Sequence, residues 1–286
     1  MSNIFYDSML LNFNSKKYDK ISSMGYAIGY LGGGLAFVLS LIFLYFSSNS
    51  SIELILSKKI VFIFAAIWWT IFMIPLLIFW NEPKEKIIHN TSIFDTFKEI
   101  KLNKSIYLFL FSYWIYIDGV DTIIRMAINY GLILGFNSTD LLLALLITQF
   151  VAFPGTLIVN KFSEYFSCET TIIVCLIVYI FISLLAYSLS NIYEFYFIAI
   201  IIGLVQGGIQ ALSRSYYARL IPANKHSEYF GIYNMLGKFA ALLGPLLVGF
   251  VTYSTDNARI GMLSIIIFFL AGIYLFKLAN NQRKVA

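Results

Sequence analysis

The sequence has few charged residues and almost no cysteine. Only 12% of its 286 residues are charged and 59% are hydrophobic, whereas soluble proteins have about 25% charged and about 45–50% apolar residues. This composition excludes a soluble enzyme, a disordered chain and a small disulfide-stabilised domain. The two cysteines, Cys168 and Cys175, provide neither a disulfide framework nor a metal site.

The motifs of catalysis and of ATP-driven pumping are also missing. No glycine-rich loop ends in a lysine that would bind phosphate. His89 and His226 fall in polar segments between apolar blocks, so neither has the pocket that a Ser–His–Asp arrangement needs. The net charge of +5 arises from short segments between apolar blocks, which does not indicate nucleic-acid binding. We therefore expect no enzymatic activity, no cofactor and no metal.

Long apolar blocks are what the sequence has instead. Eight of them cover residues 22–46, 59–80, 105–130, 139–160, 170–190, 192–214, 229–253 and 258–279. A membrane-spanning helix takes about 20 apolar residues, and a segment in the bilayer must satisfy its own backbone hydrogen bonds. The sequence therefore predicts an all-α, polytopic membrane helix bundle with eight transmembrane helices.

The basic residues alternate between the two sides of this arrangement. Fifteen of the 20 lysines and arginines lie in the N-terminal segment, the tail and the even-numbered loops, whereas only Lys58, Lys59 and Arg259 lie on the other side. Because positive charge marks cytoplasmic loops, this distribution predicts an inner-membrane protein with both termini in the cytoplasm. Arg214 is counted here at the cytoplasmic rim, and Lys238 is expected to extend to that face.

An internal repeat relates the first apolar block to the seventh. Gly25 and Gly32 correspond to Gly237 and Gly244, at a constant shift of 212 residues. Parallel repeats of six helices are typical of major facilitator transporters, which predicts eight helices of a twelve-helix architecture, without the first four. The predicted units are residues 1–80 (two helices of the N-terminal half), 81–104 (the central cytoplasmic loop) and 105–286 (the six-helix C-terminal half).

Several segments carry a more specific resemblance. They are residues 25–34 (GYAIGYLGGG), 118–125 (DGVDTIIR), 149–155 (QFVAFPG), 206–215 (QGGIQALSRS) and 230–241 (FGIYNMLGKFAA). Together these resemble the family of major facilitator proteins similar to the autophagy-related vacuolar amino-acid effluxers. The resemblance implies a secondary transporter, or permease, of small solutes that works by alternating access, with amino-acid efflux as one activity. The partners it implies are the lipid bilayer and a small-molecule solute.

The missing first four helices leave two interpretations open. The chain is either a transporter that is incomplete by itself, or a non-transporting remnant or subunit that needs a separately encoded N-terminal portion. An open reading frame upstream that ends in four membrane helices would favour a split transporter, of which this chain is one subunit.

Charged residues inside an apolar block are expected to line a cavity or to pair with each other. Asp118, Asp121 and Arg125 fall within about one third of the circumference of the third helix. They are candidates for a substrate or proton site, and a packing pair between helices is the alternative. In the sixth helix, Gln206 and Gln210 share a face, either as cavity residues or as partners in interhelical hydrogen bonds.

Glycine and proline indicate helix packing. Gly25, Gly29 and Gly33 repeat every fourth residue, a spacing that lets two helix backbones approach closely. The same residues resemble a glycine-rich motif of major facilitator antiporters, but Tyr30 occupies the position of the usual proline. Gly244 and Pro245 are expected to kink or loosen the seventh helix.

The segment 160–167 (NKFSEYFS) is expected to form the fourth loop. It resembles a degraded cytoplasmic gating motif, in which Glu164 would be the acidic residue that latches two helices together. A solvated turn is the alternative.

Overall fold

The computed structural model describes residues 2–48, 54–80, 93–222 and 225–285. The helices in these segments are α1 (Ser2–Ser8), α2 (Tyr18–Ser48), α3 (Leu54–Phe79), α4 (Ile93–Leu102), α5 (Lys104–Ile133), α6 (Ser138–Phe166), α7 (Cys168–Ser188), α8 (Ile192–Ala218), α9 (His226–Phe239), α10 (Leu243–Thr255), α11 (Ala258–Leu263) and α12 (Ile266–Val285). Two short 3₁₀ turns, η1 (Met9–Asn12) and η2 (Ser15–Lys17), connect α1 to α2.

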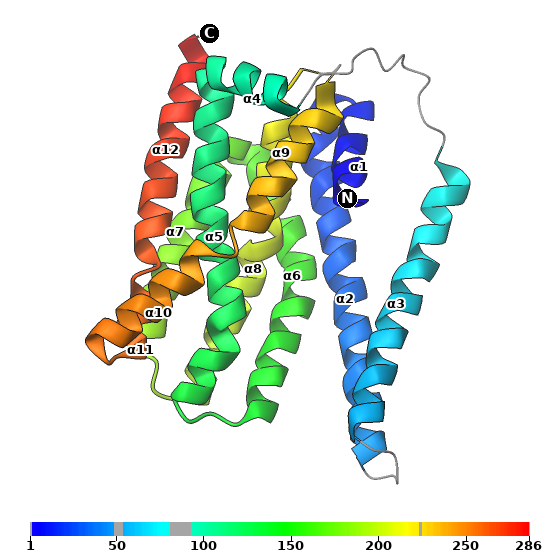
Figure 1. Cartoon of the computed structure of the whole chain (residues 1–286), viewed down its shortest axis with the longest axis vertical. Helices are drawn as coiled ribbons and strands as arrows, with labels where there is room; N and C mark the ends of the chain where they lie inside the picture. The colour runs from blue at the N-terminus through cyan, green and yellow to red at the C-terminus, as the bar shows by residue number, and fades with distance from the viewer. Residues whose placement is uncertain (1, 49–53, 81–92, 223–224, 286) are drawn as a thin grey trace.

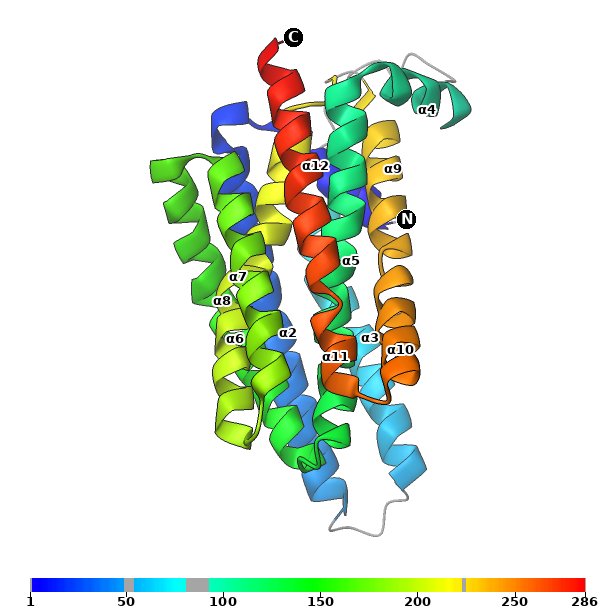
Figure 2. The ribbon, with the colours of Figure 1, turned by 90° about the vertical axis from the view of Figure 1, so that its left-hand side faces the viewer.

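In the part of the chain that the structure describes, eight stretches of helix are long and apolar enough to cross a membrane. They begin and end within a few residues of the eight predicted blocks, so the all-helical membrane fold is confirmed. Six of the spans are the single helices α2, α3, α5, α6, α7 and α8. The spans run side by side, whereas α1 and α4 lie at one end of the bundle (Figures 1 and 2).

The last two spans are each broken into two helices. The seventh consists of α9 and α10, separated by Ala240–Leu242. Proline lacks the backbone N–H that a helix interior needs, and Pro245 lies in the first turn of α10, where this loss is tolerated. The break lies just before Gly244 and Pro245, the residues at which the sequence predicts a kink. The eighth span is broken between α11 and α12, which the sequence did not predict.

Two expected loops are different in the structure. Residues 81–92 of the predicted central loop lie outside the described residues, and Ile93–Leu102 form helix α4. The segment 160–167 is not a loop, because α6 continues to Phe166. The turn to α7 is made at Ser167, whose backbone has the left-handed φ of 91°. A single residue suffices for this turn, so the polar residues of segment 160–166 lie in the last turns of α6.

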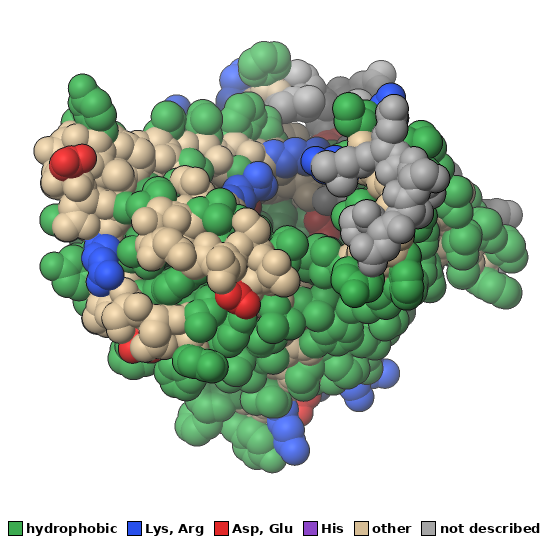
Figure 3. Space-filling model, turned by 90° about the horizontal axis from the view of Figure 1, so that it is seen from below, with side chains coloured by type: hydrophobic (Ala, Val, Ile, Leu, Met, Phe, Trp, Pro, Cys, Tyr) green, Lys and Arg blue, Asp and Glu red, His purple; other side chains and the backbone are tan. Residues whose placement is uncertain are grey.

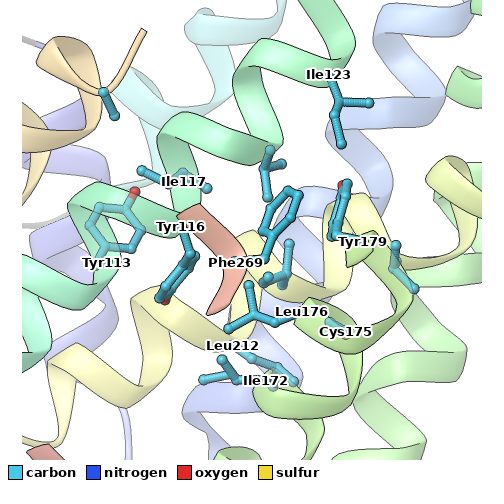
Figure 4. Packing of buried hydrophobic residues seen from close by; sticks show 14 of the residues in the cluster. Tyr113, Tyr116, Ile117, Ile123, Ile172, Cys175, Leu176, Tyr179, Leu212 and Phe269 are labelled. Carbon is cyan, nitrogen blue, oxygen red and sulfur yellow. The ribbon is translucent and has the colours of Figure 1, made fainter. Parts of the chain in front are cut away.

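The packed core lies among α5, α7, α8 and α12. Figure 4 shows the rings of Tyr179 and Phe269 side by side, and they stack with ring centroids 5.3 Å apart. The α5 and α12 backbones approach closely, because Ser112 donates a hydrogen bond of 2.8 Å to the carbonyl of Gly272. Inside a bilayer such van der Waals packing and interhelical bonds hold helices together.

Helices α2 and α3 are packed differently from one another. α2 lies against α6 and α8 along one side, whereas α3 packs on α2 at the lower end and stands apart above it (Figure 1). None of the 18 residues in the most apolar window of α3 is buried. The interior side of α2, not α3, therefore takes part in the site described next.

Candidate functional site

A cavity of about 530 Å³ lies between α2 on one side and α5, α8 and α9 on the other. Seen from below, this end of the molecule is hollowed, with charged side chains visible behind a mostly apolar rim (Figure 3). The cavity is lined by Tyr6, Asp7, Gly25, Tyr26, Gly29, Tyr30, Gly33, Tyr113, Ile117, Asp121, Gln149, Gln210, Arg214, Tyr233, Asn234, Gly237 and Lys238.

The glycine stripe of α2 faces this cavity. Gly25, Gly29 and Gly33 all line it, and a Cβ atom placed at Gly29 or Gly33 would meet nothing within 4 Å. At Gly25, by contrast, a Cβ atom would collide with the Tyr6 hydroxyl of α1, so there glycine does allow a close approach of two helices. At Gly29 and Gly33 the small residues leave one side of the helix flat, and here the flat side widens a cavity.

Two of the predicted polar residues lie in the cavity wall. Asp121 of α5 is half-buried there, and Gln210 of α8 accepts a hydrogen bond of 3.0 Å from the Tyr30 hydroxyl of α2. Gln206, one turn away, is buried and is not among the lining residues. The structure thus brings Asp121 and Gln210 to the same cavity from two different helices.

Asp118 and Arg125 are placed elsewhere. The Asp118 carboxylate accepts hydrogen bonds from the backbone N–H groups of Leu243, at 3.1 Å, and Gly244, at 2.8 Å. These are the first N–H groups of α10, which have no partner within their own helix. Asp118 therefore caps α10 at the break in the seventh span. Arg125 is exposed and is not part of the cavity lining.

Gly244 is packed against the same part of α5. A Cβ atom there would collide with the Thr122 hydroxyl and lie 2.7 Å from Asp118 Oδ1. A side chain at this position would push α10 away from the carboxylate that caps it, so Gly244 serves the close approach of the two helices.

Arg214 is buried, which corrects its expected place at the cytoplasmic rim. Its guanidinium forms an ion pair of 2.9 Å with Asp7 of α1, and the two side chains are 4% and 9% exposed. The Arg214 Nε donates a hydrogen bond of 2.9 Å to the Ser22 hydroxyl of α2. The expectation was wrong because counting lysines and arginines in loops assigns every basic residue at the end of an apolar block to a loop.

Aromatic and amide groups complete the surroundings of this ion pair. The Arg214 Cζ lies 5.0 Å from the ring centre of Tyr6 and 4.8 Å from that of Tyr26, within the range of a cation–π interaction. Asn234 of α9 donates a hydrogen bond of 2.8 Å to the second carboxylate oxygen of Asp7. Four helices (α1, α2, α8 and α9) therefore meet at one buried charge pair.

Lys238 also lines the cavity, although it was expected to extend to the cytoplasmic face. Asp121 and Lys238 are thus the charged lining residues outside the Asp7–Arg214 pair. Glu164, the predicted gating residue, is exposed near the end of α6, where it accepts a hydrogen bond of 3.1 Å from Asn160 in the preceding turn.

A second ion pair holds α8 to the start of α2. Arg219 Nη2 lies 2.7 Å from Asp19, and the Ser215 hydroxyl also donates a hydrogen bond to Asp19. Burial alone would lower the pKa of the Arg219 guanidinium, but the hydrogen bond and the charge of Asp19 outweigh burial and raise this pKa. The guanidinium therefore stays charged.

Known proteins resemble this chain in sequence over nearly its whole length. Residues 11–286 match the family described as vacuole effluxer Atg22 like. The MFS-type transporter YxiO of Bacillus subtilis is 34% identical over 98% of this chain and 68% of its own length.

The chain belongs to the Atg22-like family. Autophagy-related protein 22 of Vanderwaltozyma polyspora is 27% identical over 92% of this chain, and that of Yarrowia lipolytica is 24% identical over 92%. The chain spans 57% and 51% of the length of these two fungal relatives. The resemblance deduced from the sequence motifs is therefore confirmed. Membership makes the chain an integral membrane protein of the MFS transporter type and not an enzyme.

Proposed function

We propose that the cavity binds a small zwitterionic solute, an amino acid in the simplest case, and that the solute crosses the membrane by alternating access. The observation that carries this proposal is the presence of one carboxylate, Asp121, and one ammonium group, Lys238, in the lining of a single cavity. An α-amino acid carries the two complementary charges. The name of the family, vacuole effluxer, favours export as the direction.

The uncharged lining residues suit the same class of solute. Gln149 and Gln210 offer both hydrogen-bond donors and acceptors. The rings of Tyr26, Tyr30 and Tyr233 provide apolar walls that also carry a polar hydroxyl. A pocket with a few polar groups among aromatic walls is typical of sites for small molecules.

Asp121 is the group that we propose couples proton movement to solute movement. Acidic residues inside the membrane are costly and rare, and they mark substrate or proton pathways or pair with an opposite charge. Asp118 fits this role less well, because both of its oxygens accept hydrogen bonds from the α10 backbone. The sequence does not distinguish these two aspartates, which lie three residues apart.

The test is uptake of a panel of radiolabelled amino acids into vesicles that contain the chain, together with any membrane protein that co-purifies with it, and that carry a pH gradient. We expect Asp121→Asn and Lys238→Gln each to lower uptake at least about tenfold, as loss of a charged contact does. Asp256→Asn is the matched control. Asp256 is exposed, lies outside this cavity and has a left-handed φ of 50°, which asparagine tolerates. Equal uptake by all three variants would contradict the proposal.

A second proposal concerns what completes the site. We propose that helices of a separately encoded N-terminal portion cover α2 and α3, making the chain one subunit of the transporter. The exposed sides of α3 support this, since Phe62, Trp69 and Phe79 are all more than two-thirds exposed. Co-purification from the source organism tests it: a co-migrating membrane fragment supports the subunit, and uptake by the chain alone contradicts it.

We also propose the orientation and division of the chain. Both termini would face the cytoplasm of a bacterial cell, because most lysines and arginines lie on that side. Residues 1–80 would belong to one half of the transporter and 105–286 to the other. Reporter fusions at each terminus test the orientation, and activity of an enzyme that works only outside the cytoplasm would contradict it.

A further inference from the structure

Helix α1 lies at the end of the bundle that also carries α4, and it packs against α9 (Figure 1). Its Tyr6 side chain reaches α2, on the other side of the cavity. Tyr6 and Asp7 are themselves lining residues. Helix α1 therefore bridges the two sides of the cavity and covers it at this end, whereas the opposite end is hollowed (Figure 3).

A single side chain links α1 to the far side of the cavity. One carboxylate oxygen of Asp7 lies 2.9 Å from the Arg214 guanidinium of α8, and the other accepts a hydrogen bond of 2.8 Å from Asn234 of α9. Helix α1 has only seven residues, and isolated helices shorter than about 12–15 residues are marginal in water. Its place over the cavity therefore depends on contacts with its neighbours, among which the ion pair of Asp7 is buried.

Arg214 has other partners that do not belong to α1. Its Nε donates a hydrogen bond of 2.9 Å to the Ser22 hydroxyl and its Nη2 one of 3.2 Å to the Ser22 carbonyl. The Tyr26 ring centre lies 4.8 Å from its Cζ. The guanidinium would thus keep these contacts with α2 if α1 moved away, and α1 would stay attached to α2 through residues 9–17, which form the turns η1 and η2.

We propose that α1 is a lid on the cavity, which Asp7 holds closed and which detaches from α8 and α9 when the solute passes this end. The inference rests on the alternating access proposed above, in which the cavity opens at one end and then at the other. The structure has the lid closed and the opposite end hollowed. Lids of this kind isolate a bound solute from water until they open.

Thiol labelling from each side of the membrane tests the lid. Gly29→Cys provides the reporter, because Gly29 lines the cavity and a Cβ atom there meets nothing within 4 Å. The chain, with any membrane protein that co-purifies with it, is placed in vesicles, and a charged thiol reagent that does not cross bilayers is added outside. Helix α12 ends at the same end of the bundle as α1 (Figure 1). Capture by a C-terminal tag therefore separates vesicles that expose the α1 end from those that expose the opposite end.

The reporter should react at least about tenfold more slowly from the α1 end than from the opposite end, because the reagent has to wait for the lid to open. Asp7→Asn removes the charge that pairs with Arg214. In this variant labelling from the α1 end should rise at least about tenfold, whereas labelling from the opposite end should not change.

The matched control is Asp19→Asn. It breaks another ion pair with α8, that of Asp19 with Arg219, and Asp19 is not among the lining residues of the cavity. Both labelling rates should stay as they are in the Gly29→Cys parent.

Any other outcome overturns the lid. Equal labelling of the parent from the two ends would mean that α1 does not cover the cavity. An unchanged rate in Asp7→Asn would mean that Asp7 does not hold the lid closed. A rise of the same size in Asp19→Asn, or from both ends in Asp7→Asn, would mean that the fold has loosened as a whole. The labelling uses no solute, so a failure of amino-acid uptake contradicts the proposed function and leaves this measurement unaffected.

Discussion

The two ends of the cavity hold their charges in different ways. At the α1 end, Arg214 and Asp7 are buried together, and Ser22, Asn234 and two tyrosine rings contact them. In the wall formed by α5 and α9, Asp121 and Lys238 line the open volume. The difference indicates that the first pair braces four helices, while the second pair is available to a solute. Substitutions at the first pair should therefore lower stability, whereas substitutions at Asp121 and Lys238 should lower uptake and leave stability nearly unchanged.

The largest effect is expected when the buried ion pair is broken. Arg214→Ala leaves the Asp7 carboxylate buried without its cation, a change that costs about 3–5 kcal/mol. The matched control is Arg219→Ala, whose ion pair with Asp19 is less buried, with side chains 20% and 19% exposed. This change should cost less, because water reaches the remaining carboxylate. Reversible unfolding of both variants in mixed detergent measures the difference. Equal losses of unfolding free energy would show that the Asp7–Arg214 pair does not hold the four helices together.

The next largest effect separates two aspartates that the sequence treats alike. Asp118→Ala removes the acceptor of two α10 N–H groups, and each buried group left unsatisfied costs about 1–3 kcal/mol. Asp121→Ala has no backbone partner to lose and should cost less than about 1 kcal/mol. The same unfolding measurement compares them, and a greater loss for Asp121→Ala would reverse the roles that we assign.

The smallest effect on stability compares glycines that face protein and cavity. Gly155→Ala would place a Cβ atom 2.6 Å from the Leu204 Cα, and overpacking of this kind costs about 1–3 kcal/mol. Gly33→Ala meets nothing within 4 Å and should leave the unfolding free energy unchanged. If Gly33→Ala destabilises as much as Gly155→Ala, then the glycine stripe of α2 is a packing surface after all.

The sequence predicts the eight spans well because block length and hydrophobicity decide whether a helix crosses a bilayer. It predicts the break near Pro245 for a local reason, the missing N–H of proline. The break between α11 and α12 falls at Ser264 and Ile265, where neither a proline nor a charge marks it in the sequence.

The candidate site was harder to predict because its members come from distant parts of the chain. Asp7 and Arg214 are 207 residues apart, and no periodicity links α1 to α8. The glycine stripe has the same spacing whether it faces a helix or a cavity, so the pattern alone favoured packing. Asp118 and Asp121 point in directions about 60° apart on α5, enough to send one to α10 and the other to the cavity.

Thiol accessibility at Gly33 tests the central claim most directly. Gly33→Cys in lipid nanodiscs should react with a charged, water-soluble thiol reagent, and a transported amino acid should slow the reaction. Cys168 and Cys175 are buried and provide the unreactive reference. Rapid labelling with protection by solute is the result expected for a water-filled binding cavity lined by α2. A Gly33→Cys thiol as unreactive as the two native cysteines would contradict it.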